Sequence, residues 1–289
     1  MIHNTKPEID VHPFVDEHDK EAYDKADEKC KVWQKRGWLI RDPKEMYSVY
    51  AQTMEGRTQY GLVVCAHTED YTEGRIKKHE LTRKDKEEDR MIHIRIQSAN
   101  IEPVFFTYHD VPEINRIVEK IVSATPEYDF VAPDGFGHHF WPVSDDADIQ
   151  RLTTLFASVP AFYVADGHHR TAAAALVGAG RKDANPNHTG EEEYNYFMTV
   201  VFPESHLKII DYNRVVKDLN GMAPQTFLQA LAKDFIVECL CDNTIPYVPQ
   251  RPHNFSMYLD GCWYSLTARQ GTYDDSDPIG TLDVTVCLL

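Results

Sequence analysis

The stretch Phe162–Leu176, FYVADGHHRTAAAAL, shapes our expectation of the fold more than any other part of the chain. Its first residues are apolar and typical of a buried strand. Its end, Thr171–Leu176, is rich in alanine, which favours a helix. The polar residues Asp166–Arg170 lie between the two, so we expect them at a strand-to-helix turn.

The residue types of this turn suit an anion. A helix N-terminus offers unpaired N–H groups and the positive end of the helix dipole. Gly167 lets the backbone approach a ligand closely or adopt a positive φ, and the planar fork of Arg170 matches phosphate oxygens. Asp166 is a candidate to hold a metal ion or accept a proton. We therefore expect a phosphate or nucleotide site; the alternative is a plain helix cap at Asp166 or Gly167, with incidental histidines.

Composition narrows the class of protein. The 289 residues carry a net charge of −16 with no compensating basic stripe, which argues against nucleic acid but not against a small anionic ligand. The six cysteines form no CxxC pair and are interpreted as reduced thiols. No apolar run reaches the length of a membrane span, and the polar, acidic N-terminus does not resemble a signal peptide. We expect a cytoplasmic enzyme.

Mixed hairpins and helices predict an α+β fold rather than a doubly wound sheet. The expected strands are 46–54, 58–66, 104–108, 194–202 and 207–210, with hairpins at 128–131/138–141 and 254–260/262–268. The expected helices are 21–36, 84–98, 112–124, 145–157 and 224–235. Gly178 and Gly180 are interpreted as the end of the alanine-rich helix, followed by a polar loop. The apolar ending, residues 285–289, leads us to expect that a further segment is missing.

A second polar run, Lys77–Arg83, precedes the charged helix. Glu80 is a candidate general base, since a hydroxyl must lie within hydrogen-bond reach of the carboxylate that deprotonates it. His79 is a candidate ligand contact. The alternative is a solvated charged run with Thr82 as the helix N-cap and Asp85 in the first turn.

Two further groups are weaker candidates. His138 and His139, together with the histidines of the turn, would make a zinc site only if the fold brought all of them together. Arg214, on an expected helix face that ends near Gly221, is a candidate contact for a substrate anion. The chain contains neither a P-loop nor a G-x-S-x-G elbow.

Three runs, ADGHHR at 165–170, KKHELTR at 77–83 and YNRVVKDLNG at 212–221, together resemble a bacterial family of uncharacterised proteins from about residue 20 to the end. More distantly, Gly167-His168-His169-Arg170 resembles the G-x-x-R phosphate turn of the ParB/sulfiredoxin superfamily, which includes free-serine kinases. The resemblance implies a ParB/sulfiredoxin-like mixed sheet with helices. It implies a nucleotide-binding core at 1–205 and a smaller α+β part at 206–289, which we expect to be truncated.

The resemblance also implies roles for individual residues. Glu80 matches the glutamate that deprotonates serine in those kinases, and Asp166 matches an aspartate that positions metal or substrate. The sulfiredoxin cysteine is absent, since His168 and His169 stand in its place, so cysteine redox chemistry is not expected.

The leading hypothesis is an ATP- or ADP-dependent, Mg²⁺-requiring kinase that converts free L-serine to O-phosphoserine. The expected nucleotide-binding residues are Gly167, His168, His169 and Arg170; the catalytic residues are Glu80 and Asp166, the latter also binding metal; the substrate contacts are His79, Arg83 and Arg214. A nucleotide-binding switch without turnover and a metal-dependent hydrolase are the alternatives. A small-molecule substrate is the expected partner, with no nucleic acid or membrane, and self-association into a homo-oligomer stays open.

Overall fold

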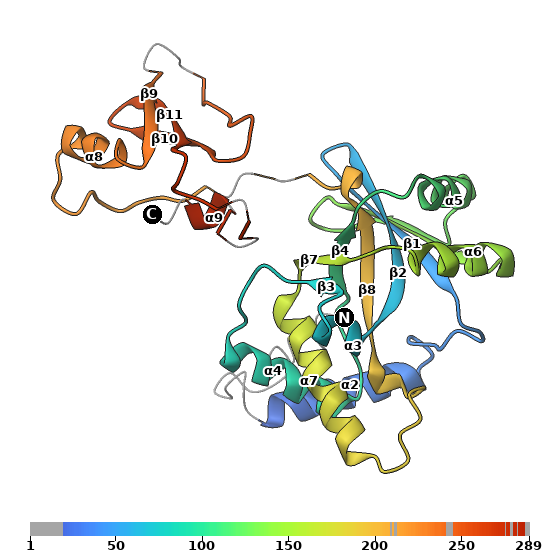
Figure 1. The fold of residues 1–289 in the computed structure, drawn as a ribbon. Coiled ribbons are helices and arrows are strands. Elements are labelled where there is room, and N and C mark those ends of the chain that lie inside the picture. Colours follow the sequence, from blue (N-terminus) through green and yellow to red (C-terminus); the bar gives the residue numbers. More distant parts are fainter. Residues whose placement is uncertain are drawn as a thin grey trace. The chain divides into compact units, whose positions relative to one another are not determined.

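The computed structural model describes residues 20–208, 210, 213–240, 245–274, 276–277, 280–281 and 283–286. The chain forms two compact units, Met1–Ile209 and Ile210–Leu289. Each unit combines a sheet with helices, so the expected α+β class is confirmed. Figure 1 shows the elements of both.

The first unit is built on an eight-stranded mixed sheet in the order β3-β7-β4-β8-β2-β1-β6-β5. The pairs β3–β7 and β4–β8 are parallel, and the other neighbours are antiparallel. The strands are β1 (Tyr47–Met54), β2 (Arg57–His67), β3 (Ile76–Lys77), β4 (Val104–Tyr108), β5 (Tyr128–Val131), β6 (Gly137–Val143), β7 (Phe162–Asp166) and β8 (Tyr196–Pro203).

The main core of this unit lies on one face of the sheet. Val49 pairs with Leu62 on one side and with Trp141 on the other, and all three are buried in the same cluster. Cross-strand partners share a face, so the pairing places these large apolar side chains together. Val164 of β7 joins the same cluster, which anchors the strand that leads into the polar turn.

Helices pack near the two ends of the sheet (Figure 1). The helix α5 contacts β1 and β6, whereas α7 contacts β4 and β8 and packs on α4. Ala172–Ala175 are buried, and their small side chains let α7 approach its neighbours closely. The helices are α2 (Lys20–Lys35), α3 (Thr68–Thr72), α4 (Lys84–Gln97), α5 (Pro112–Val122), α6 (Asp146–Phe156) and α7 (His168–Ala184).

The parallel pairing of β3 and β7 positions the polar residues. The carboxyl ends of neighbouring parallel strands lie at the same edge of a sheet. The loop Lys78–Arg83, which follows β3, therefore leaves the sheet beside Gly167, which follows β7. Two polar runs that are far apart in the sequence are thus brought to one edge.

Several local predictions were wrong. Gly178 and Gly180 do not end α7, which continues to Ala184. Gly178 is instead a packing position within the helix, where only a hydrogen fits beside Tyr194. Thr82 is not the N-cap of α4; Arg83 is, and the Thr82 hydroxyl donates to Glu87 instead.

The second unit was also predicted incompletely. The described residues within 207–210 form no strand, and those within 213–220 form no helix. Its sheet has the order β10-β11-β9 and packs with α8 around Phe235 and Leu266. Its elements are α8 (Pro224–Leu231), β9 (Phe235–Cys239), β10 (Asn254–Leu259), β11 (Cys262–Ala268) and α9 (Asp283–Val286).

Cys262 is disulfide-bonded, so the expectation that all six cysteines are reduced thiols was wrong. No helix in the described ranges is both long and apolar enough to cross a membrane.

The tight packing of α7 can be tested with two glycines of the same helix. A Cβ on Gly178 would lie 2.6 Å from the backbone oxygen of Tyr194, whereas a Cβ on Gly180 would meet nothing within 4 Å. We expect Gly178→Ala to lower the free energy of unfolding by about 1–3 kcal/mol and Gly180→Ala to raise it by about 0.5–1 kcal/mol. Urea unfolding measures both, and equal effects would contradict this packing.

Candidate functional site

Gly167 makes the turn between β7 and α7. It is the N-cap of α7 with φ of 95° and ψ of 30°, in the left-handed region that favours glycine. A Cβ at this position would lie 3.1 Å from Cγ1 of Val104 and 3.3 Å from Nε of Arg170. The position therefore needs glycine for both its backbone conformation and its close contacts.

No side chain caps α7 among the described residues. The first-turn N–H groups of a helix have no intrahelical partners, so those of His168, His169 and Arg170 can donate to an anion. The expected strand-to-helix turn is present, with α7 beginning at His168.

The side chain of Arg170 stabilises the turn through contacts with neighbouring segments. Its Nη2 donates to Oδ2 of Asp166 at 2.8 Å, and its Nη1 donates to the backbone oxygen of Pro103 at 2.9 Å. Nη1 also lies 3.3 Å from Oε2 of Glu102. The guanidinium thus joins the end of β7 to the segment that enters β4, and it lies between two carboxylates.

The loop after β3 contacts the start of α7 at three points. Oε2 of Glu80 lies 3.6 Å from Nδ1 of His168, and the rings of His79 and His168 meet edge to face with centroids 4.5 Å apart. The backbone N–H of Arg83 donates to Nε2 of His169 at 3.1 Å. Both adjacent histidines therefore serve to hold this loop against the helix.

His168 is the buried member of the cluster, with 5% of its surface exposed. Burial lowers the pKa of its imidazole, and the neighbouring His79 lowers it further, whereas Glu80 and Asp166 oppose the shift. The imidazole is therefore neutral at pH 7. Its Nε2 is buried without a hydrogen-bond partner among the described residues.

Of the three residues predicted to contact the substrate, the structure places only one in the cluster around His168. His79 lies in the cluster, but the Arg83 guanidinium points to Asp85, with Nη2 and Oδ2 2.5 Å apart. Arg214 lies in the second unit, with an exposed side chain, and is no part of the geometry described for the first. Glu102 was missed because it lies in an irregular segment whose sequence carries no sign that Arg170 approaches it.

The fold does not bring together the four histidines that were considered as a zinc site. His138 and His139 lie on β6, which is five strand positions from β7, or roughly 24 Å at the usual strand spacing. His138 bonds to the hydroxyl of Tyr50, and His139 pairs with Asp129. Among the described residues no group of three or more His, Cys, Asp and Glu side chains could hold a metal ion. The zinc hydrolase therefore has no support in this fold.

Residues 1–285 match the family described as "Protein of unknown function (DUF1015)", and the chain belongs to that family. This confirms the expected membership in an uncharacterised family. No curated protein matches the chain. A search of solved structures gives no match either.

Replacing Gly167 tests whether the turn needs glycine for more than its φ. Gly135, at φ of 87° with nothing within 4 Å of an added Cβ, is the matched control. We expect Gly135→Ala to cost about 1 kcal/mol from the backbone alone. Gly167→Ala should cost about 2–3 kcal/mol, because its Cβ also displaces Val104 or Arg170. Equal losses in urea unfolding would contradict the close approach.

His168 should make stability depend on pH. Because its pKa is lower in the folded chain than in the unfolded one, the unfolded state binds the proton more readily, and stability falls as the pH drops below about 6.5. We expect the melting temperature to fall less between pH 7 and pH 5 in His168→Gln than in the wild type. Gly180→Ala, which changes no titratable group and meets nothing within 4 Å, should retain the wild-type slope. A His168→Gln slope equal to that of the wild type would contradict a buried neutral imidazole.

Proposed function

We propose that the chain is an ATP- or ADP-dependent kinase that phosphorylates a small hydroxyl compound, with free L-serine as the substrate. The observation that carries the proposal is the 3.6 Å between Oε2 of Glu80 and Nδ1 of His168. It means that a carboxylate lies beside the uncapped start of a long helix. A base next to a phosphate-binding position is the arrangement that phosphoryl transfer to a hydroxyl requires.

The start of α7 would bind the phosphates. Three features support this role: the N–H groups of His168–Arg170, the positive φ of Gly167 that exposes them, and the guanidinium of Arg170 directly below. The resemblance of Gly167–Arg170 to the G-x-x-R turn of the ParB/sulfiredoxin superfamily points the same way, and in this proposal the mixed sheet of the first unit is of that kind. The superfamily likeness is an analogy of fold, so the chemistry must be argued from the side chains.

Glu80 would act as the general base. Its side chain is 57% exposed, so a substrate hydroxyl can reach it, and the neutral His168 behind it holds the carboxylate near α7. In the reaction the serine Oγ–H proton passes to Glu80 while Oγ attacks the terminal phosphorus. The bond from that phosphorus to its bridging oxygen breaks, and the leaving group is ADP from ATP or AMP from ADP.

The charge around the site supports the proposal that the nucleotide binds together with a cation. Asp166 and Glu102 both pair with the guanidinium of Arg170, and the carboxylate of Glu80 lies beside His168. A phosphate would meet net negative charge there unless Mg²⁺ came with it. Mg²⁺ binds to one or two carboxylates together with substrate phosphates, and the Asp166 side chain, 72% exposed, fits that role. The ion would supply neutralisation of phosphate charge.

The substrate contacts follow from the same loop. His79 lies beside His168 and is exposed on its other side, so it is positioned to contact the amino acid. Arg83 would have to leave Asp85 to bind a carboxylate, at little cost because both side chains are more than 60% exposed. Arg214 is proposed as a substrate contact only from its place in the sequence run.

Formation of phosphoserine tests the proposal. The full-length chain would be incubated with L-serine, Mg²⁺ and either ATP or ADP, and phosphoserine would be quantified by mass spectrometry. We expect product with the wild type and a kcat about 10²–10⁴-fold lower in Glu80→Gln. The control Glu88→Gln removes an exposed carboxylate of α4 and should leave kcat unchanged.

Other outcomes would overturn parts of the proposal. If the wild type forms no phosphoserine, the proposed serine kinase activity is contradicted. Tight nucleotide binding without product would favour the alternative, a nucleotide-binding switch. An unchanged kcat in Glu80→Gln would remove Glu80 as the base. Inorganic pyrophosphate, tested as a third donor, contains the phosphoanhydride bond without a nucleoside. If phosphoserine formed with pyrophosphate but with neither ATP nor ADP, phosphoryl transfer would be supported and a nucleotide donor would be contradicted.

A further inference from the structure

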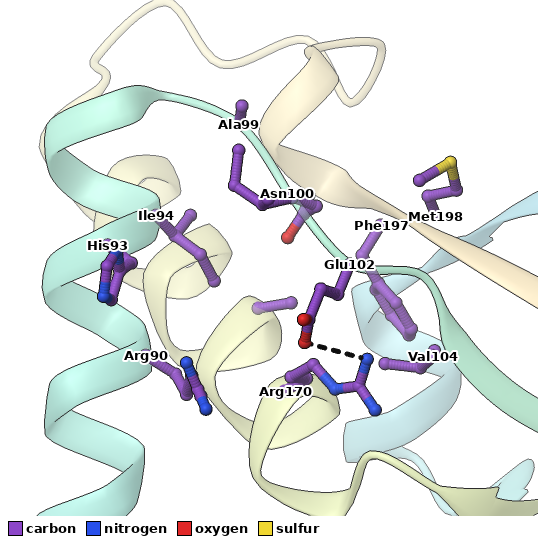
Figure 2. Close-up of a pocket in the computed structure, with 12 residues that line it drawn as sticks. Arg90, His93, Ile94, Ala99, Asn100, Glu102, Val104, Arg170, Phe197 and Met198 are labelled. Atoms are coloured by element: carbon purple, nitrogen blue, oxygen red, sulfur yellow. Dashed lines mark ion pairs between the residues drawn. The ribbon is translucent and has the colours of Figure 1, made fainter. Parts of the chain in front are cut away.

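A small cavity lies on the other side of Arg170, between α4, α7 and the segment that enters β4 (Figure 2). Its volume is about 50 Å³. Most of its lining is apolar, and its charged residues are Arg90, Glu102 and Arg170. Arg170 belongs both to the lining of this cavity and to the turn that begins α7.

Two guanidinium groups therefore line one small space with a single carboxylate. Figure 2 shows Glu102 reaching toward Arg170 and the Arg90 side chain at the α4 side of the same cavity. The contact of Glu102 with Arg170 is 3.3 Å, longer than the 2.8 Å contact of Asp166 with the same guanidinium. The ion pair that Arg90 makes with Asp89 is longer still, at 3.8 Å.

We propose that this cavity binds one phosphate group between Arg90 and Arg170, and that the carboxylate of Glu102 occupies the position of that phosphate when no ligand is bound. The choice of phosphate over another oxyanion rests on the proposed function. A bound phosphate would displace Glu102 toward solvent, where its side chain is already 42% exposed.

The size and the lining of the cavity support a single oxyanion. A volume of about 50 Å³ corresponds to roughly three to five water molecules, which is space for a tetrahedral anion and not for a nucleoside. The apolar neighbours, such as Ile94 and Phe197, reduce the screening of charge in the cavity. Arginine binds phosphate through two parallel N–H donors. Arg90 is held by a long contact of 3.8 Å with Asp89, and Arg170, although fixed by Asp166 and Pro103, meets Glu102 at 3.3 Å.

The proposal assigns opposite effects to two charged neighbours of Arg170. Removing the charge of Glu102 removes the competitor, so phosphate should bind more tightly. Removing the charge of Arg90 removes a ligand, so phosphate should bind more weakly. A merely structural role of either residue would not predict an increase in affinity from Glu102→Gln.

Titration calorimetry of the full-length chain with inorganic phosphate, without serine or a phosphoryl donor, tests this assignment. We expect about a tenfold gain in affinity for Glu102→Gln and about a tenfold loss for Arg90→Gln. The control Glu113→Gln breaks the exposed ion pair with Arg151 between α5 and α6 and should leave the affinity unchanged. Thermal melts verify that each variant is folded.

The outcomes separate this proposal from the kinase. No measurable phosphate binding by the wild type, or an affinity of Glu102→Gln that is unchanged or reduced, would overturn the cavity as a phosphate site. If the chain binds phosphate as expected but forms no phosphoserine, the phosphate site in the cavity is supported and the proposed kinase activity is contradicted. A second titration with ATP identifies the source: a parallel gain for Glu102→Gln supports a nucleotide phosphate, and a gain for inorganic phosphate alone supports the free anion.

Discussion

The guanidinium of Arg170 connects the parts of the first unit that make the candidate site. It donates to Asp166 at the end of β7 and to the backbone oxygen of Pro103 before β4, and it pairs with Glu102. These contacts fix the position of the α7 N-terminus relative to the neighbouring strands β7 and β4. Gly167 must then pass over the guanidinium with a positive φ, which leaves the first N–H groups of α7 facing outward.

The same contacts determine which charges lie around the start of α7. In a chain of net charge −16, the start of α7 has no side-chain cap and lies close to the guanidinium of Arg170. Asp166 and Glu102 both pair with this guanidinium, so under the proposed function a phosphate would arrive with a cation or displace a carboxylate. Neutral His168 adds no charge and serves to hold the loop that carries Glu80.

Much of the fold was predictable because its signals are local. The apolar strand before Asp166 and the alanine-rich helix after it were both expected, and β4 begins and ends where expected. The end of α7 was not, because Gly178 is a helix-ending signal locally but a packing contact with Tyr194 in the fold. Tertiary packing overrides such weak local preferences.

The candidate site was predictable only in part. Residues of the turn are contiguous in sequence, so their proximity required no knowledge of topology. The approach of Glu80 depends on β3, a two-residue strand too short to leave a pattern, and on its parallel pairing with β7. The separation of His138 and His139 from the turn depends on strand order, and the contact of Glu102 depends on the path of an irregular segment. None of these follows from local sequence.

In the proposed function, the start of α7 binds phosphate and Glu80 lies beside it. A crystal structure of the chain with ADP and Mg²⁺ tests it most directly. We expect a phosphate oxygen within hydrogen-bond distance of the backbone N–H groups of His169 or Arg170, with the Glu80 carboxylate facing the terminal phosphate. ADP bound elsewhere on the chain, or phosphates turned away from α7, would contradict it.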